Sequence, residues 1–263
     1  MNTGKTYTGA FAWLLKSFTI ALPLCAAFGA PSEATAADWN VGIWKSVSGS
    51  GTIKTETRDV SGFTGIGLSL GGSLEIRQGG TEGVSIEADD NILPLIETVV
   101  ENATLKIRPK ARNISFPVKN VKIVVNAKSL DRIDVSGGGD IYAGALKSVA
   151  LKAGVSGSGD IRIKSLDADA VSISIAGSGD FEAAGRAGNL LANIAGSGDI
   201  KAGKLEAKGA EINIAGSGDA TVWVRSTLKV SIAGSGDVKY YGDAQVQNSV
   251  RGSGSVNRLG AAP

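Results

Sequence analysis

Six aspartates, each closing a glycine-rich turn, recur along this chain at nearly constant intervals. The letters IAGSGD occur four times and VSGSGD and VSGGGD once each, with 18 to 20 residues between successive aspartates. An imperfect seventh copy, RGSGS, has Ser255 at the aspartate position. Carboxylates at such a spacing could bind Ca²⁺, form a recognition stripe on a surface, or accept hydrogen bonds from backbone N–H groups of their own turn. The six residues are Asp140, Asp160, Asp180, Asp199, Asp219 and Asp237.

Turn capping is the interpretation that the residue types favour. One carboxylate per repeat falls short of the six or more oxygens that a hard cation takes, and no second acidic residue recurs in phase. Glycine supplies the positive φ of a tight turn, and aspartate accepts hydrogen bonds from nearby N–H groups. We therefore expect the aspartates to face solvent and to cap their own turns, with calcium binding and surface recognition as alternatives. We expect Arg162, Lys201 and Lys239 to relieve repulsion at Asp160, Asp199 and Asp237, each two residues earlier.

An aromatic pair is the second candidate for recognition. Trp223 and Tyr241 each follow their aspartate by four residues, in consecutive repeats. If the two rings lie next to each other on an outer face, they could bind the flat faces of sugar rings. Alternatively, they could simply pack against each other across neighbouring strands. No catalytic, cofactor-binding or metal-binding residue is assigned. The absence of histidine from the chain excludes His-based triads.

The elements that carry these residues are short β-strands. Positions one and three after each aspartate, and five and seven before it, are mostly Ile, Val or Ala, with small or polar residues between them. This alternation is typical of strands with one buried face. A unit of about twenty residues cannot bury its apolar side alone but can do so by stacking on its neighbours. We predict an all-β, right-handed parallel β-helix with about seven regular coils of 18–20 residues.

The region before residue 133 is less regular but also rich in strands. GIGLSLGGSLEIRQG, GVSIEA, ATLKIRP and VKIVVNA alternate in the same way. In NILPLIETVVEN the proline and the β-branched run predict a turn or one helical turn. We expect this irregular, β-rich part to cover the first regular coil, because an open solenoid end is an exposed sheet edge.

The N-terminus has the features of an export signal. Lys5 and Lys16 flank an apolar stretch, and ATA at residues 34–36 fits a cleavage site, so residues 1–36 are assigned as a signal peptide. Residues 37–57 would form an arm or cap, and residues 58–263 a single domain. We expect a periplasmic, extracellular or surface-associated protein without a transmembrane segment in the mature chain. Without the signal peptide, 25 basic and 24 acidic residues remain, so the chain lacks the excess of positive charge that is typical of nucleic-acid-binding proteins.

Three features together resemble the bacterial head GIN domain, a family described as a "putative autotransporter adhesin head". They are RDVSGFTGIGLSLGGSLEIRQG at residues 58–79, DDNILPLIETVVENATLKI at residues 89–107, and the series of GSGD turns. The resemblance covers roughly residues 58–256. It implies a right-handed parallel β-helix related in shape to pectin-lyase-like folds, with a role in adhesion at the cell surface, and it supplies no catalytic residues.

The function expected from these observations is binding without catalysis. An exported β-solenoid would recognise a surface polymer, a glycan or a protein, with no cofactor. One alternative is a polysaccharide-active enzyme of pectin-lyase-like shape, although short, uniform turns provide no loop-built groove. The other is a structural envelope protein that assembles through exposed coil edges.

Overall fold

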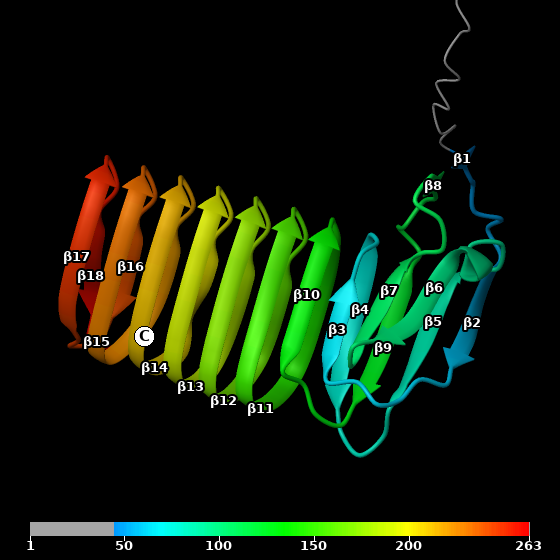
Figure 1. Cartoon of the computed structure of the whole chain (residues 1–263), viewed down its shortest axis with the longest axis horizontal. Coiled ribbons are helices and arrows are strands. Elements are labelled where there is room, and N and C mark those ends of the chain that lie inside the picture. The colour runs from blue at the N-terminus through cyan, green and yellow to red at the C-terminus, as the bar shows by residue number, and fades with distance from the viewer. Residues whose placement is uncertain (1–44, 263) are drawn as a thin grey trace, which may run out of the picture. The chain divides into compact units, whose positions relative to one another are not determined.

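The protein is a parallel β-solenoid, which confirms the predicted fold class; it has about six turns, where about seven regular coils were predicted. The structure, a computed structural model, describes residues 45–262. The predicted signal peptide and the first part of the expected arm lie outside the described residues. Successive coils rise along the near strands, turn over at the glycine-rich corner and descend behind, so that the stack is right-handed (Figure 1).

Five long strands each follow almost a whole coil, bending as they go. Each pairs in parallel with the next, in register on both sides of the corner: Ile141, Ile161 and Phe181, for example, occupy equivalent positions. A sixth, shorter coil consists of β16 (Val238–Tyr241), β17 (Gln245–Gly252) and β18 (Val256–Gly260). The five long strands are β11 (Gly139–Gly157), β12 (Ile161–Gly177), β13 (Phe181–Gly196), β14 (Ile200–Gly216) and β15 (Ala220–Gly234).

The core is a continuous column of aliphatic side chains inside the coils. In β12 the buried residues alternate with exposed ones, as the strand pattern predicts: Ile161 and Ile163 on the first leg, Ile173 and Ile175 on the last. Each fully buried aliphatic side chain stabilises the fold by about 1.5–3 kcal/mol relative to exposure. Because every coil buries several, the stack rather than any single coil is the unit of stability.

Differences in coil length are absorbed at the bends. The coil that starts at Asp180 is one residue shorter than its predecessor, and the register shifts once, between Ile163 and Leu166. Similar shifts follow Glu182 and Ala202 in the next two pairings. The residues beside each corner stay in register throughout. The aspartates, and the residues two positions after them, therefore form straight rows along the solenoid.

The irregular N-terminal part covers the first regular coil, as predicted. β10 (Arg132–Gly137) pairs with β3 (Gly65–Leu68), which pairs with β7 (Thr104–Pro109), which in turn pairs antiparallel with β6 (Ile96–Glu101). The proline-containing segment forms one 3₁₀ turn, η1 (Leu93–Leu95), before β6 begins. The remaining strands here are β4 (Gly72–Gln78), β5 (Gly83–Asp89), β8 (Ile114–Ser115) and β9 (Lys122–Ala127).

The described part of the expected arm lies against this cover. β1 (Lys45–Ser46) pairs with β8, and β2 (Ile53–Arg58) pairs antiparallel with β5. Between them, the N–H of Gly51 donates to the buried carboxylate of Asp89 at 2.7 Å. These contacts attach residues 45–58 to the outer side of the cover.

The last coil differs from the others in its inward positions. Asn248 stands in the row of Val230, and Arg258 in the row of Tyr240. The Arg258 guanidinium folds back and donates to the carbonyl oxygen of Gly242 at 2.7 Å. Polar residues at positions that are apolar elsewhere are typical of a terminal capping repeat.

Candidate functional site

The corner between coils is formed by Gly-Ser-Gly-Asp, and stacking requires both of its glycines. The first glycine has a positive φ, from 104° at Gly137 to 143° at Gly234, which other L-residues adopt only with strain. The second is pressed against the preceding coil, since a Cβ on Gly159 would lie 2.0 Å from the carbonyl oxygen of Gly139. The glycines therefore need no ligand to explain them.

The aspartate supplies an acceptor that the backbone of the corner lacks. The carbonyl oxygen of Gly157 accepts two N–H groups of the next coil, from Ser178 at 2.8 Å and Gly179 at 3.1 Å. The following N–H, that of Asp180, donates instead to Oδ1 of Asp160 at 2.9 Å. Each carboxylate thus satisfies one backbone donor at the corner of the next coil, which would otherwise lose a hydrogen bond.

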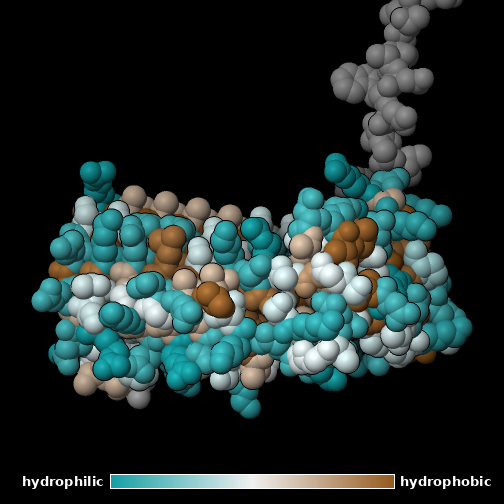
Figure 2. All heavy atoms as spheres, turned by 60° about the horizontal axis from the view of Figure 1, so that its bottom comes forward, coloured by the Kyte–Doolittle hydropathy of each residue, from teal (hydrophilic) through white to brown (hydrophobic). Residues whose placement is uncertain are grey.

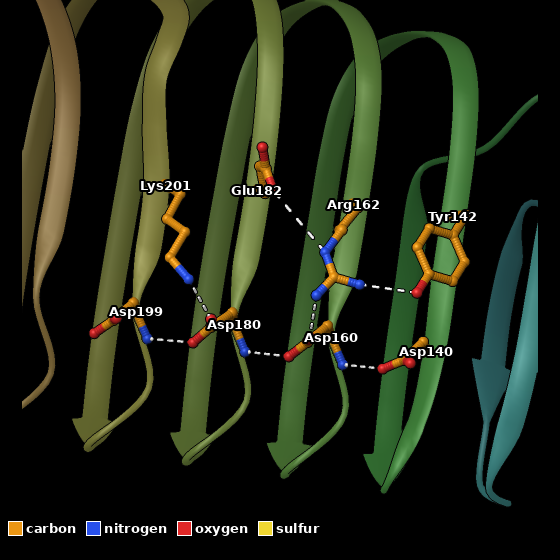
Figure 3. A network of polar contacts seen from close by, with 8 residues as sticks. All are labelled: Asp140, Tyr142, Asp160, Arg162, Asp180, Glu182, Asp199 and Lys201. Carbon is orange, nitrogen blue, oxygen red and sulfur yellow. Dashed lines mark hydrogen bonds and ion pairs between the residues drawn. The ribbon is translucent and has the colours of Figure 1, made fainter.

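This bond repeats at every regular corner and forms what we call the aspartate ladder. Its N···O distances lie between 2.8 and 3.1 Å from the first pair to the last, and Figure 3 shows three successive bonds of the series. Ser255 ends it, because its N–H and its hydroxyl both donate to Oδ1 of Asp237 at 2.8 Å. The ladder residues are Asp140, Asp160, Asp180, Asp199, Asp219 and Asp237.

The predicted role of these aspartates is wrong in two respects, their exposure and the coil that they cap. They were expected to be solvent-exposed caps of their own turns, but they are half-buried and accept from the following coil. The close contact at the second glycine explains the difference, because it brings adjacent corners together until the nearest free donor belongs to the neighbour.

Two basic residues neutralise part of the ladder. As predicted, Arg162 pairs with Asp160, at 2.6 Å between Nη2 and Oδ2. Its Nη1 also donates to the Tyr142 hydroxyl at 2.9 Å, with the guanidinium 5.4 Å from the ring centroid (Figure 3). Lys201 was expected to pair with Asp199, but its Nζ lies 2.5 Å from Oδ2 of Asp180. In-register stacking brings the preceding coil's carboxylate within reach of the long lysine side chain.

Lys239, the third basic residue of this row, forms no ion pair among the described residues. It still acts electrostatically on Asp237. Hydrogen bonds from the Ser255 hydroxyl and N–H, together with the charge of Lys239, lower the pKa of the Asp237 carboxyl. The expected relief of Asp237 by Lys239 is therefore a through-space effect.

The environment of Asp180 favours its ionised form. Burial opposes ionisation, but the hydrogen bonds from Lys201 and from the Asp199 N–H, with the charges of Lys201 and Arg162, hold the pKa of Asp180 below its ordinary value. The same hydrogen bond raises the pKa of the Lys201 ammonium. Both groups stay charged at neutral pH, so this part of the ladder is an ion-paired network.

A surface groove of 760 Å³ lies beside the ladder, between Tyr142 and Tyr241. It passes over small residues at the first bend of successive coils, including Gly144, Ala184 and Gly203. The backbones of Tyr142 and Tyr241 are five coil steps apart, but the Tyr241 ring reaches back over Gly203, three coil steps or about 14 Å from the coil of Tyr142. We call it the tyrosine groove; its charged and polar lining consists of Glu75, Arg162, Lys164, Glu182, Lys201, Lys204 and Thr221.

The predicted aromatic pair is adjacent, but only one member lines this groove. Trp223 and Tyr241 are register partners in neighbouring coils. The Tyr241 ring packs over Gly203, two coils back, where a Cβ would lie 3.4 Å from Cε2. Of the residues described, those lining the groove include Tyr241 and not Trp223, whose ring edge lies against Gly242.

Sequence reasoning missed the other end of the groove. Tyr142 stands two residues after Asp140, in the row of Arg162, whose side chain contacts it. Lys164 and Lys204 at the bend were also missed. Their positions relative to the aspartate differ because the bends absorb the variation in coil length. The signal that could have found Tyr142 is an aromatic residue in a row otherwise occupied by charged or hydroxyl side chains.

The ladder is not arranged as a metal centre. Within residues 45–262, no group of three or more Asp, Glu, His or Cys residues could hold an ion. One oxygen of each ladder carboxylate is already bonded to a backbone N–H group. The aspartates are thus accounted for by coil-to-coil bonding.

A second groove, of 650 Å³, follows a later bend of the coils. Its lining is mostly aliphatic, small or amide-bearing, with Leu191 as an exposed large hydrophobic residue and Lys152, Glu211 and Lys229 as charged residues. It contains no aromatic side chain. It therefore offers less for oriented recognition than the tyrosine groove does.

A parallel β-solenoid with a repeated corner and a surface groove belongs to the class of elongated repeat scaffolds. The chain is a member of the family described as "Putative auto-transporter adhesin, head GIN domain", which matches residues 62–244. This confirms the resemblance seen in the sequence. The family is named for adhesion and not for a reaction. Among curated proteins, none matches the chain.

Solved structures of related proteins share the fold. A "putative adhesin" from Bacteroides fragilis NCTC 9343 is 27% identical, with a TM-score of 0.77, over 81% of this chain and 100% of its own. A "putative lipid binding protein" from Parabacteroides distasonis ATCC 8503 is 31% identical, with a TM-score of 0.66, over 82% and 100%. A "putative adhesin" from Parabacteroides merdae ATCC 43184, 23% identical with a TM-score of 0.61 over 81% and 99%, shares the fold.

Within residues 45–262, no helix has the length and apolar character needed to cross a bilayer.

Proposed function

We propose that this protein is an exported, non-enzymatic adhesion module that holds an extended glycan in the tyrosine groove. The observation that carries the proposal is the groove's form. It follows the solenoid axis for about 14 Å from the coil of Tyr142 to the Tyr241 ring over Gly203, passes over small residues, and has a tyrosine toward each end. A long open channel suits a polymer better than a compact metabolite, which is usually enclosed.

The chemistry of the lining supports a sugar ligand. Tyrosine combines a flat apolar ring with a polar hydroxyl, and such side chains recur where one side of a contact is apolar and the other is wet. Arg162 and Lys201 are held in place by Asp160 and Asp180, so their remaining N–H groups are positioned before a ligand arrives. Ring faces and hydroxyl groups of a glycan match these two kinds of group.

Surface character also favours a polar ligand. Figure 2 shows a face of the solenoid on which hydrophilic residues predominate and hydrophobic residues form separate small patches. A lipid ligand deserves testing because a relative of 31% identity is named as a lipid binding protein. The second groove, with its exposed Leu191, is where an acyl chain would fit.

The test is retention of the purified full chain on an array of bacterial and host glycans, with vesicle flotation in parallel. Wild type should bind at least one linear glycan, and Tyr241→Ser should weaken binding by about tenfold, because the ring contact is lost. Leu191→Ser, the matched control in the second groove, should leave glycan binding unchanged. Thermal unfolding of both variants checks that they fold.

Three results would contradict the proposal. The first is binding to vesicles alone, particularly if Leu191→Ser abolishes it, which would move the function to the second groove and to lipid. The second is glycan binding that survives Tyr241→Ser in a folded protein, which would place the glycan elsewhere. The third is depolymerisation of a retained glycan, which would make the protein an enzyme.

A further inference from the structure

Basic residues recur in every second coil along one wall of the tyrosine groove. The row two positions after the aspartates is in register from the coil of Asp140 to that of Asp237. Basic and non-basic residues alternate in it without exception over six coils. In order the row reads Tyr142, Arg162, Glu182, Lys201, Thr221 and Lys239.

The bend beside this row repeats the alternation. Lys164 belongs to the same coil as Arg162, and Lys204 to the same coil as Lys201. The intervening coil has Ala184 at its bend, and Lys204 is its register partner. Within the groove lining, two coils with two cations each therefore flank a coil with none, and these cationic coils are about 9.6 Å apart, twice the strand spacing.

The two lysines at the bend are available to a ligand. Arg162 and Lys201 are paired with ladder aspartates (Figure 3). Within residues 45–262, Lys164 and Lys204 form no ion pair, and both are exposed. The charged residues lining the groove are four basic and two acidic, Glu75 and Glu182, so the lining has an excess of positive charge. An anionic group near either lysine would gain a charge-assisted hydrogen bond.

We infer that the glycan held in the tyrosine groove is a linear polysaccharide with an anionic group on every second sugar. The inference rests on the proposed function and specifies its ligand. A sugar in an extended glycan advances by close to one coil spacing, so alternate sugars face alternate coils. Carboxylate or sulfate groups on alternate sugars then meet Lys164 and Lys204. The uncharged sugar between them passes Ala184, close to Glu182, whose carboxylate disfavours an anion at that position.

The experiment compares three oligosaccharides of equal length by calorimetry with the full chain. A hyaluronan fragment has a carboxylate on alternate sugars, a polygalacturonate fragment on every sugar, and a cello-oligosaccharide on none. The hyaluronan fragment should bind most tightly, by about fivefold or more over the neutral one. The double variant Lys164→Gln/Lys204→Gln should weaken it by about tenfold, roughly threefold per exposed charge pair. Wild-type affinity for it should fall as salt rises.

A matched control makes the same charge change outside the groove. Lys119→Gln/Lys208→Gln removes two exposed lysines that line neither groove, and should leave all three affinities unchanged. Equal binding of neutral and acidic fragments, or no effect of Lys164→Gln/Lys204→Gln, overturns the inference and leaves the groove as a glycan site. Tighter binding of polygalacturonate overturns the alternate spacing. Binding of no glycan on the array overturns the proposed function itself.

Discussion

Replacing Asp180 with alanine should destabilise the solenoid by removing one rung of the aspartate ladder. The Asp199 N–H would lose its acceptor, Oδ1 of Asp180 at 3.0 Å. It has no backbone alternative, because the carbonyl oxygen of Gly177 already accepts from Ser197 and Gly198. A hydrogen bond to a charged group contributes about 1.5–3 kcal/mol, and the Asp180 side chain is only 26% exposed. We expect the free energy of unfolding to fall by about 2–3 kcal/mol.

Asp180→Asn separates the acceptor from the charge. Asparagine keeps an oxygen at the Oδ1 position but cannot pair with Lys201. Since a neutral hydrogen bond retains about 1 kcal/mol and the neutral side chain no longer repels its neighbouring carboxylates, the loss should be less than half of that in Asp180→Ala. Urea unfolding of the full chain, followed by circular dichroism, measures both variants.

Asp169→Ala is the control for this comparison. Asp169 is exposed at a bend of the preceding coil and, among the described residues, its side chain forms no hydrogen bond or ion pair. Its replacement should change stability by less than about 0.5 kcal/mol. If Asp180→Asn is as unstable as Asp180→Ala, the charge rather than the acceptor position holds the coils together, and the account of the ladder is refuted.

Three further predictions concern the corner and its neighbours. The pKa of Asp180 is lower in the folded than in the unfolded chain, so its contribution to the free energy of unfolding should be complete above the unfolded pKa of about 3.9 and decline as the pH falls below it. Urea midpoints measured across this pH range should fall less steeply with decreasing pH in Asp180→Asn than in wild type. Equal pH slopes in the two proteins would contradict the pairing. Gly179→Ala would place a Cβ 2.0 Å from the carbonyl oxygen of Gly159 and should lower the free energy of unfolding by about 3 kcal/mol. Ser178→Ala, at the exposed residue just before it, should lower it by less than about 0.5 kcal/mol in the same urea assay. Burial raises the pKa of Asp134, and the charge of Arg132 only partly offsets this, so the ionised carboxylate disfavours folding at neutral pH. The urea midpoint of Asp134→Asn at neutral pH should therefore equal or exceed that of wild type, and this advantage should disappear in acid. A clearly lower midpoint at neutral pH would show that the ionised carboxylate is needed.

The fold could be predicted from the sequence because each coil of the solenoid corresponds to one repeat of the sequence. One marker aspartate per coil fixes the phase, and the alternation around it assigns Ile161 and Ile175 to the interior without knowledge of any contact. The irregular cover was predictable only in outline. Strand candidates such as residues 122–127 were visible, but their pairing with two different strands, one parallel and one antiparallel, depends on distant segments that no local pattern specifies.

The site was less predictable than the fold, for two physical reasons. A period identifies equivalent residues but not the coil to which a side chain reaches, so Lys201 was assigned to Asp199 although it pairs with Asp180. The groove, in turn, follows the bends, where Gly144 and Ala184 both follow their aspartate by four residues but Lys204, the register partner of Ala184, follows its aspartate by five. An alignment on the aspartate therefore separates Lys204 from Ala184, with which the structure brings it into register.

Identical bonding at every corner makes each coil an interchangeable part. A gene that lost the codons for residues 160–179 would still encode a chain in which the Asp180 N–H faces a carboxylate of the same kind, that of Asp140, at an equivalent corner. Duplication would lengthen the stack by the same rule, while the cover at one end and the polar coil at the other stay as they are. The length of the surface offered to a partner can therefore evolve by whole coils, without redesign of the corner or of either end.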